Sequence, residues 1–273
     1  MRGPEKESIK PRGLRDYLLA RGRPVITLPE ASELLNLPKR EAARALLRLR
    51  GAGEMFSPSR GLYLAVPPQY RNWGTLPALD FVDPMMRVGG FEYYVALLSA
   101  AELHGAAHQR PQVFQVIVDH RVEDRDFGRV RVKFYTSKRA GLAPTEVRNT
   151  DTGQVRVSTP GVTALDLASR PNESGGLSNV ATVLVELGED HKLEGGLVEE
   201  AAEHFPNSSL RRLGWLLDRV DASIDTDRLN ELVLLRAAPG SRPGVLLDPA
   251  GERRGRTDPR WGVIENTEVE PDL

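Results

Sequence analysis

The sequence predicts an α+β protein in two parts. The first 70 residues contain two helical patterns separated by Asn36-Leu37-Pro38, and the pattern of a β-hairpin follows them. Residues 112–157 contain short strands, and helical patterns fill most of residues 160–235. We therefore expect an N-terminal winged helix-turn-helix, followed by a mixed α/β domain with a small antiparallel sheet and a helical C-terminal part.

Residues 11–49 are expected to supply the three helices of the first domain. Residues 11–22 form the first pattern, which ends at Gly22. Apolar residues then recur at helical spacing on both sides of the break, at Leu28, Ala31, Leu34 and Leu35 before it and at Ala42, Ala45, Leu46 and Leu49 after it. Thr27 and Glu30 form the capping-box signature of the helix that begins at Leu28.

The hairpin is expected directly after these helices. Met55–Ser57 and Gly61–Ala65 are predicted to pair as strands around the turn residues Pro58, Ser59 and Arg60. This hairpin would be the wing. Pro67-Pro68 and the polar residues after them predict a linker. We therefore place the first domain at residues 1–70 and the second at residues 71–273.

The helix after the break presents positive charge to solvent. With its apolar residues turned inward, its outward positions are Lys39, Arg40, Glu41, Arg44 and Arg48. A basic helix after a sharp turn suits the major groove of DNA, because that groove admits one α-helix and its base edges distinguish the base pairs. The alternative is an ordinary solvated surface helix. The wing favours the recognition helix of a DNA-binding domain.

The distribution of charge along the chain supports the same interpretation. Lys and Arg number 13 in residues 1–70 against 7 Asp and Glu, whereas residues 71–273 have 24 against 31. A basic module attached to an acidic one indicates that the first module binds the phosphates of nucleic acid and that the second module has a different partner or function.

Composition excludes several classes of protein. The chain has no cysteine, which excludes disulfides, thiolate nucleophiles and cysteine-based zinc sites. It has no uncharged apolar run of about 18 residues, and its first ten residues lack the apolar core of a signal peptide. We therefore expect a cytoplasmic protein with no membrane partner.

The second domain is expected to begin with a short helix over residues 80–87 and a strongly apolar helix from Phe91 to Ala107. A four-stranded antiparallel sheet is then predicted from Gln112–Asp119, Gly128–Ser137, Thr145–Asn149 and Gln154–Val157. Five helices are predicted at Pro160–Ser169, Ser178–Leu187, Glu194–His204, Ser208–Val220 and Thr226–Leu235. Trp261–Ile264 predicts an edge strand near the C-terminus.

The motifs of common enzyme sites are missing from the sequence. His104 and His108 are four residues apart, as zinc ligands on a helix are, but no third ligand is near and a packing or capping role is favoured. Asp119, Asp124 and Asp126 are interleaved with arginines, which predicts a solvated loop rather than a magnesium site. Neither a nuclease pattern nor a phosphate-binding loop is present. We expect no enzymatic activity, no cofactor and no metal.

Asp166 and the pair Arg211-Arg212 are charges set among apolar residues. Because burying an unpaired charge costs several kcal/mol, we expect Asp166 to pair with Arg211 or Arg212 inside the helical part.

Five segments, in their order along the chain, resemble the AbiEi antitoxins of type IV toxin–antitoxin systems. They are the winged helix-turn-helix, Tyr93–Val118, Arg156–Ser169 (RVSTPGVTALDLAS), Leu210–Asp218 (LRRLGWLLD) and Asp258–Val269 (DPRWGVIENTEV). The resemblance covers nearly the whole chain. It implies an antitoxin that counteracts a nucleotidyltransferase toxin and represses its own operon by binding inverted repeats in the promoter. Whether such a protein touches the toxin directly stays open.

The resemblance also implies where DNA is bound. The contacts fall on Lys39, Arg40, Arg44 and Arg48 of the recognition helix and on Ser57, Ser59 and Arg60 of the wing. An inverted repeat has two half-sites, so two monomers binding cooperatively or a weak dimer would satisfy it. In the second domain, the basic strand face of Arg129, Arg131 and Lys133 is the surface singled out for an acidic partner, and an ordinary exposed sheet face is the alternative.

Two other functions are weighed against the antitoxin. The first is a stand-alone winged-helix transcriptional regulator whose acidic domain senses a small molecule. The second is a nuclease or transferase with a DNA-targeting module, which the missing carboxylate, lysine and phosphate-loop patterns disfavour.

Overall fold

The structure is a computed structural model that describes residues 9–106, 111–189, 193–220, 224–237 and 243–271. By the density of contacts, the chain divides into two compact units. Unit 1 comprises Met1–Glu92, Glu123–Val132 and Arg148–Val155, and unit 2 comprises Tyr93–Val122, Lys133–Val147 and Arg156–Leu273. The unit that contains the winged helix thus takes in residues beyond 70, and a domain boundary at residue 70 stays a prediction.

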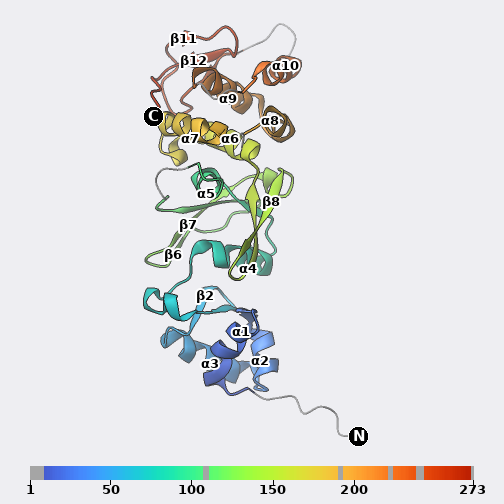
Figure 1. The fold of residues 1–273 in the computed structure, drawn as a ribbon, viewed down its shortest axis with the longest axis vertical. Helices are drawn as coiled ribbons and strands as arrows, with labels where there is room; N and C mark the ends of the chain where they lie inside the picture. The colour runs from blue at the N-terminus through green and yellow to red at the C-terminus, as the bar shows by residue number, and fades with distance from the viewer. Residues whose placement is uncertain (1–8, 107–110, 190–192, 221–223, 238–242, 272–273) are drawn as a thin grey trace. The chain divides into compact units, whose positions relative to one another are not determined.

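The N-terminal part of unit 1 has the element order and the sheet of a winged helix-turn-helix (Figure 1). Its elements are η1 (Pro11–Gly13), α1 (Leu14–Ala20), β1 (Val25–Thr27), α2 (Leu28–Leu34), α3 (Lys39–Gly51), β2 (Met55–Ser59) and β3 (Leu62–Ala65). The strands form an antiparallel sheet in the order β1-β3-β2. Helices and sheet share one core, whose members include Leu14, Ile26, Ala31, Leu46 and Met55. The three predicted helices and the predicted hairpin are confirmed.

Short-range interactions set the helix-turn-helix. The Glu30 carboxylate accepts the Thr27 hydroxyl at 2.7 Å and the Thr27 N–H at 2.6 Å, so the predicted capping box begins α2. These hydrogen bonds lower the pKa of Glu30. After α2, Asn36 takes a φ of 51°, a conformation in which asparagine is enriched. Pro38 then precedes the first turn of α3.

The wing differs from the expectation in where it turns. Strand β2 extends to Ser59, so the turn consists of Arg60 and Gly61 rather than of Pro58 to Arg60. The register of the hairpin shifts between Phe56 and Ser59. Pro58 lies within this irregular stretch, which suits a residue that has no N–H to donate to a neighbouring strand.

The residues expected to form a linker after the wing are ordered within unit 1. They contain the 3-10 helix η2 (Pro68–Trp73), and α4 (Ala78–Gly89) follows. Arg71 of η2 lies 3.4 Å from the carboxylate of Glu54, which precedes the wing. The stretch from residue 67 to residue 77 thus contains a 3-10 helix, most of whose residues are exposed, and buries only Thr75 and Leu76.

The second sheet has six strands in the order β6-β7-β5-β4-β9-β8. They are β4 (Tyr93–Val95), β5 (Phe114–Val118), β6 (Arg125–Asp126), β7 (Arg131–Thr136), β8 (Thr145–Thr150) and β9 (Gly153–Ser158). The four predicted strands are confirmed as β5, β7, β8 and β9. The prediction of four purely antiparallel strands is wrong, because β4 and β6 join the sheet and β4 pairs with β9 in parallel.

Strand β4 also corrects the helix predicted from Phe91 to Ala107. Tyr93, Tyr94 and Val95 lie in a strand between β5 and β9, and helix α5 is confined to Leu97–Leu103. A central strand that is buried on both faces has a continuous apolar sequence, which periodicity does not distinguish from a buried helix. Ala107 lies outside the described residues.

Aromatic rings join the wing strand to other elements of unit 1. Phe56 of β2, Phe81 of α4 and Phe127 of the β6–β7 hairpin pack edge to face. The distances between ring centroids are 5.2 Å from Phe56 to Phe81, 5.0 Å from Phe56 to Phe127 and 5.4 Å from Phe81 to Phe127. Each pair is in the arrangement that the ring quadrupoles favour.

The five helices predicted for unit 2 are confirmed as α6 (Pro160–Ser169), α7 (Leu177–Gly188), α8 (Gly195–Ala202), α9 (Asn207–Arg219) and α10 (Asp227–Leu235). Helix α6 is buried along most of its length and packs against α8 and α9. Two glycines allow close packing, since a Cβ atom at Gly161 would lie 2.2 Å from the Leu197 carbonyl oxygen and one at Gly214 would lie 2.2 Å from the Trp261 ring. Among the described residues, no helix has the length and apolar character needed to cross a membrane.

The C-terminal segment forms a small mixed sheet. Strand β12 (Val263–Glu265) lies between β10 (Val245–Leu246), which is parallel to it, and β11 (Arg256–Thr257), which is antiparallel. The prediction of an edge strand at Trp261–Ile264 is wrong, because β12 is central. Its two neighbours have two residues each, which is too short for a recognisable alternation in sequence.

Asp166 does not have the partner that the sequence predicts. Its carboxylate is fully buried in α6 and accepts hydrogen bonds from the Tyr94 hydroxyl at 3.0 Å and from the Arg139 guanidinium at 3.2 Å. Arg139 lies in the 3-10 helix η3 (Lys138–Gly141), which the sequence does not predict.

The two arginines expected to pair with Asp166 bind main-chain carbonyls instead. Arg211 donates to the carbonyl oxygens of Pro243, Trp261 and Gly262. Arg212 donates through Nε to the carbonyl oxygen of Leu246 at 2.8 Å. The predicted pairing is wrong because carbonyl oxygens, whose positions depend on the fold, satisfy buried guanidinium N–H groups as a carboxylate would.

Candidate nucleic-acid interface

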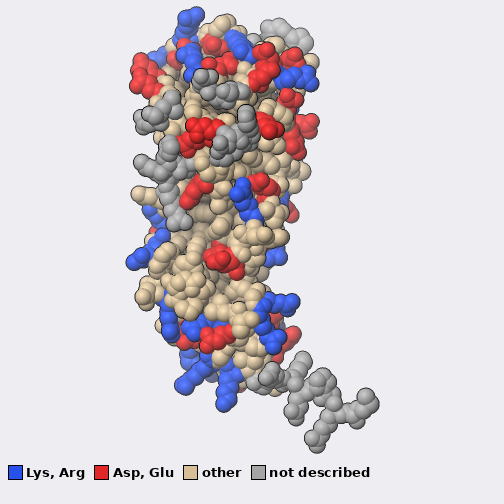
Figure 2. All heavy atoms as spheres, in the orientation of Figure 1, with Lys and Arg blue, Asp and Glu red and all other residues tan. Residues whose placement is uncertain are grey.

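Helix α3 presents a basic face to solvent. Its buried residues are Ala42, Ala45, Leu46 and Leu49, as the spacing predicts. Lys39, Arg40, Arg44 and Arg48 are exposed. The three arginines follow one another at intervals of four residues, so they form one stripe along the helix. Figure 2 shows Lys and Arg side chains gathered over the part of unit 1 where Figure 1 labels α1, α2 and α3.

Among the described residues, the cations of this stripe are unpaired, unlike several arginines of unit 2. Within the described part of the chain, the side chains of Lys39, Arg40, Arg44 and Arg48 have no ion pair or hydrogen bond. In unit 2, by contrast, Arg139 and Arg219 are each paired with a carboxylate. A free guanidinium reaches a phosphate without first breaking an existing pair, so the stripe is well suited to a polyanion.

Two further residues of α3, which are not among the residues predicted to contact DNA, are exposed in the structure. Leu47 is 57% exposed between Arg44 and Arg48, and Arg50 is exposed in the last turn. The same period that turns Ala42, Ala45, Leu46 and Leu49 inward places Leu47 outward, so this signal was present in the sequence. An apolar side chain on such a face can contact the C5-methyl group of thymine.

The wing residues are less uniform than the helix residues. Arg60 is exposed at the turn, whereas Ser57 and Ser59 are half-buried, and the Ser57 hydroxyl donates to the Ser59 carbonyl at 3.1 Å. The turn is held to the start of α2, because the Leu28 N–H donates to the Gly61 carbonyl at 2.9 Å. Of the three, Arg60 is the side chain most available to a phosphate, and the DNA contacts of all three stay predictions.

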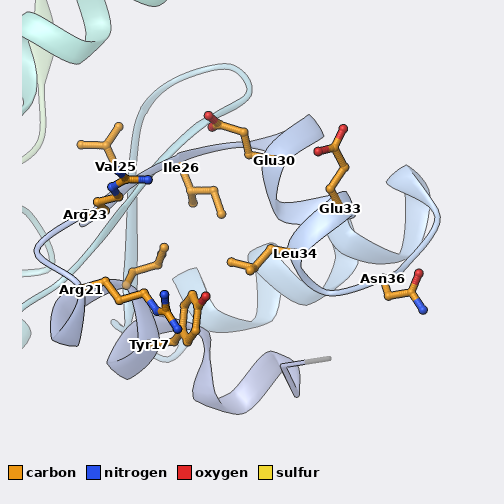
Figure 3. A pocket seen from close by; sticks show the side chains of 10 residues that line it. Tyr17, Arg21, Arg23, Val25, Ile26, Glu30, Glu33, Leu34 and Asn36 are labelled. Atoms are coloured by element: carbon orange, nitrogen blue, oxygen red, sulfur yellow. The ribbon is translucent and has the colours of Figure 1, made fainter. Parts of the chain in front are cut away.

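A groove of about 820 Å³ lies beside the helix-turn-helix, lined by residues of α1, β1 and α2. Figure 3 shows Tyr17, Arg21 and Arg23 toward one side of it and Glu30 and Glu33 toward the other. The Arg21 guanidinium lies 4.3 Å from the centroid of the Tyr17 ring. Because its charged side chains are two arginines and two glutamates, the groove does not extend the basic character of α3.

His104 has a structural role. Its Nε2 atom lies 2.8 Å from the Ser158 carbonyl oxygen, and its Nδ1 atom lies 3.4 Å from the Glu146 carboxylate. His108, the other half of the candidate metal pair, lies outside the described residues. Among the residues that the structure describes, no group of three His, Asp or Glu side chains is placed to hold a metal ion.

The acidic residues before β7 are held by local contacts. Asp126 accepts the Gly128 N–H at 2.8 Å, Asp119 lies 2.9 Å from the imidazole of His120, and Asp124 is exposed. Asp124 and Asp126 are exposed, as the prediction of a solvated loop requires, whereas Asp119 is half-buried and its Oδ1 atom has no partner among the described residues.

The basic residues of the β7 region are exposed, as the alternation predicts. Arg129, Arg131 and Lys133 are exposed, while Val132 between them is buried. The Arg129 guanidinium lies 5.8 Å from the centroid of the Trp73 ring. Exposure alone does not separate a partner surface from an ordinary sheet face, so this surface stays a prediction.

The motifs that carry the resemblance build the core of unit 2. Trp261 is almost completely buried, and its Nε1 atom donates to the Asp218 carboxylate at 2.7 Å. Arg211 binds the main chain of the same C-terminal segment, and Gly214 leaves room for the Trp261 ring. These residues therefore fasten the C-terminal segment to α9.

The N-terminal part of unit 1 has the element order and the sheet of a winged helix-turn-helix, and its basic α3 is the candidate nucleic-acid interface. Residues 94–219, which lie largely in unit 2, match the family model of the AbiEi antitoxin C-terminal domain. The match identifies this part of the chain as similar to that domain and does not extend to the winged helix-turn-helix. The match supports the role of an antitoxin in a toxin–antitoxin system.

A solved structure has a similar fold. It is that of the RV2827C protein from Mycobacterium tuberculosis, which is 18% identical in sequence, with a TM-score of 0.64 over 93% of this chain and 90% of that chain. At this level of identity the likeness concerns the fold alone, and it agrees with the predicted α+β class. No curated protein matches the sequence.

Proposed function

We propose that the protein is the antitoxin of a type IV toxin–antitoxin system, which counteracts a nucleotidyltransferase toxin and represses its own operon by binding inverted repeats in the promoter. The AbiEi antitoxin C-terminal domain at residues 94–219 carries this proposal. The winged helix-turn-helix with its exposed basic stripe supports the DNA-binding part of it.

The DNA-binding task is assigned to the winged helix within residues 1–70. Recognition helix α3 enters the major groove, where its side chains contact base edges and phosphates. The contacting residues on α3 are Lys39, Arg40, Arg44 and Arg48, and those on the wing are Ser57, Ser59 and Arg60. Two copies bind the two half-sites of an inverted repeat, as cooperative monomers or as a weak dimer.

Neutralisation of the toxin is assigned to residues 71–273. The family match lies in this part, which has a net negative charge, whereas residues 1–70 have a net positive charge. A division of tasks follows: the first module sets where the protein binds on DNA, and the second acts against the toxin.

The reading frame next to this gene provides the first test. A nucleotidyltransferase gene beside it supports the antitoxin, and a gene of another kind favours the regulator with a sensor domain. The growth test then uses that toxin, expressed from an inducible promoter, with the full chain expressed from an unrelated one. The full chain is expected to restore growth. Failure to restore growth at matched protein levels would overturn the antitoxin proposal.

Repression is tested separately, with a reporter driven by the native promoter. The full chain is expected to lower reporter output. A variant with Arg40→Ala and Arg44→Ala is expected to lose repression and to keep the ability to restore growth, because the two tasks lie in different parts of the chain. Loss of growth rescue by this variant would contradict that division.

A further inference from the structure

A groove of about 460 Å³ opens in unit 2 at the start of α9. Its lining comes from Arg139 of η3, from residues 169–173 at the end of α6 and directly after it, from the first turns of α9, and from Pro249 and Ala250 after β10. Its volume falls within the range of about 300 to 1,000 Å³ that is usual for small-molecule sites. The groove is separate from the proposed DNA-binding residues, all of which belong to unit 1.

Arg212 of α9 is the central cation of this groove. The residue is only 9% exposed, and its Nε atom donates to the Leu246 carbonyl oxygen at 2.8 Å. Within the described residues, its two terminal nitrogen atoms have no hydrogen-bond partner. Burial lowers the pKa of Arg212, and the charge of Asp248 only partly opposes this effect. Its free terminal donors line the groove, where an anion can accept hydrogen bonds from them.

The N-terminus of α9 faces the same groove through Ser208 and Ser209. Pro206 is the N-cap residue and offers no side-chain cap, and the first turn contains no acidic residue. Among the residues described, the N–H groups of Asn207 and Ser208 and the Ser208 hydroxyl have no acceptor or partner. These free donors and the helix dipole favour an anion at this position.

Two more arginines line the groove, and their carboxylate partners do not cancel all of its charge. Arg139 is paired with buried Asp166 at 3.2 Å, and the buried Nε atom of Arg139 has no partner among the described residues. Arg170 lies 3.7 Å from Glu173, which is beyond hydrogen-bond distance. The lining therefore contains three guanidinium groups and one carboxylate, that of Glu173.

We propose that this groove binds a phosphorylated small molecule, whose phosphate group lies at the N-terminus of α9 between Arg212, Arg170 and Ser208. The terminal nitrogens of Arg212 and the guanidinium of Arg170 donate to the phosphate oxygens, as do the Ser208 hydroxyl and the free N–H groups of the first turn. The remainder of the groove holds the group that the phosphate esterifies. This assignment is independent of whether the winged helix binds an operator.

The arrangement of donors favours a phosphate over a carboxylate. A phosphate has three or four oxygen atoms and a charge near −2 at neutral pH, and so accepts from several directions at once. The donors of this groove come from two side chains on α9, from one after α6 and from the backbone at the start of α9, so they belong to separate segments of the chain. A planar carboxylate would leave part of this set unsatisfied.

The proposal is tested on the full chain by isothermal titration and by the shift in melting temperature, at constant ionic strength. The probes are inorganic phosphate, ADP, adenosine as the matched compound without phosphate, and acetate as a carboxylate. Phosphate and ADP are expected to bind and to raise the melting temperature, and adenosine and acetate are not. Tighter binding of ADP than of inorganic phosphate supports a nucleotide-sized ligand, and equal binding supports recognition of the phosphate alone.

Two variants locate the site. Arg170→Gln removes one donor, and Ser208→Asp places a carboxylate at the N-terminus of α9, where it stabilises the helix but repels phosphate. Each is expected to weaken binding of phosphate by about tenfold or more, as for loss of a charge-assisted hydrogen bond. Ser208→Asp is expected to keep or raise the melting temperature without ligand, which separates lost binding from lost folding. Arg219→Gln, at the other end of α9, is the matched control and is expected to bind as the wild type does.

Four results would overturn the proposal. They are no binding of phosphate or ADP by the wild type, unchanged binding by both Arg170→Gln and Ser208→Asp, binding of acetate as tight as that of phosphate, and loss of phosphate binding in Arg44→Ala. The last result would place the bound phosphate on the winged helix instead of in this groove.

Discussion

Arg139 and Asp166 form an ion pair at 3.2 Å in which the carboxylate is fully buried. Burial raises the pKa of Asp166 to about 6. The charge of Arg139 and the hydrogen bond from Tyr94 lower this pKa, but their effect is smaller than that of burial. Burial and the Asp166 charge also raise the pKa of Tyr94, so its hydroxyl remains a donor. The native state therefore holds a carboxyl group that changes its charge in mildly acidic solution.

Replacing Asp166 with Asn should flatten the dependence of stability on pH. The pKa of Asp166 is about 6 in the native state against 3.8 for an ordinary solvated aspartate, so the native protein keeps a proton that the unfolded chain has already lost. The unfolding free energy of the wild type therefore falls as pH rises through this window, on the order of 1 to 3 kcal/mol. Asn does not titrate, so the Asp166→Asn variant should lack this decrease.

Urea denaturation of both proteins at intervals between pH 4 and pH 7.5 measures the difference. The comparison is between variant and wild type, because Asp80 contributes a slope of the same sign. Parallel curves for the two proteins would show that Asp166 does not titrate in this range.

Replacing Arg139 with Met should destabilise the protein more at pH 8 than at pH 5. At pH 8 the buried carboxylate of Asp166 loses its counter-ion, which costs about 2 to 4 kcal/mol. At pH 5 Asp166 is mostly protonated, so the variant loses mainly a hydrogen bond. Arg219→Met is the control, since its ion pair with Glu265 is exposed and such pairs contribute little. Equal losses at the two pH values would contradict the charge assignment.

Replacing Asp80 with Asn should stabilise unit 1 above pH 7. Burial and then the charge of Asp151 raise the pKa of Asp80 to about 6, so the wild type loses stability as pH rises to that value. Asn removes the repulsion and keeps an oxygen for the Asp151 N–H. We expect a gain of about 1 to 2 kcal/mol at pH 8 and little change at pH 5.

Thermal and urea unfolding at the two pH values test the Asp80 prediction. Asp83→Asn on the same helix removes the ion pair of Asp83 with the exposed Arg87 and is the matched control, for which no gain is expected. A loss of stability at pH 8 in Asp80→Asn would show that the Asp80 charge is favourable in the native state.

Replacing Phe127 with Ala should loosen the wing strand. Its ring contacts Phe56 of β2 and Phe81 of α4, and Phe127 is half-buried. We expect a loss of about 1 to 3 kcal/mol in the unfolding free energy, less than for a fully buried ring. Faster amide hydrogen exchange in residues 55–65 would report the effect on β2 and β3. Leu142→Ala, at a side chain that is 68% exposed, is the control and should be nearly neutral.

Replacing Arg44 with Ala should weaken binding to the operator. If Arg44 contacts a base edge, the loss on the operator should exceed the loss on unrelated DNA by about 1 to 3 kcal/mol. Fluorescence anisotropy with both DNAs at two salt concentrations measures this. Equal losses with a smaller salt dependence would make Arg44 a phosphate contact. Arg87→Ala, on α4 and outside the proposed interface, should bind as the wild type does.

The sequence by itself determined the features that depend on neighbours within a few residues. The capping box of Thr27 and Glu30, the turn at Asn36 and the buried stripe of α3 follow from local hydrogen bonds and from the helical period. The exposed basic stripe of α3 follows from the same period. Four of the strands and all five C-terminal helices could be placed for this reason too.

Only the tertiary structure decided the features that depend on distant residues. Residues 93–95 form strand β4 because β5 and β9 pair with them on either side. The apolar sequence of these residues does not show which strands will be their neighbours. Asp166 pairs with Arg139 and Tyr94, which are 27 and 72 residues away along the chain. The groove at the start of α9 likewise gathers residues from separate segments. Buried charges take whichever partners the packing brings within reach, so the sequence predicted that Asp166 would be paired, and the fold chose the partner.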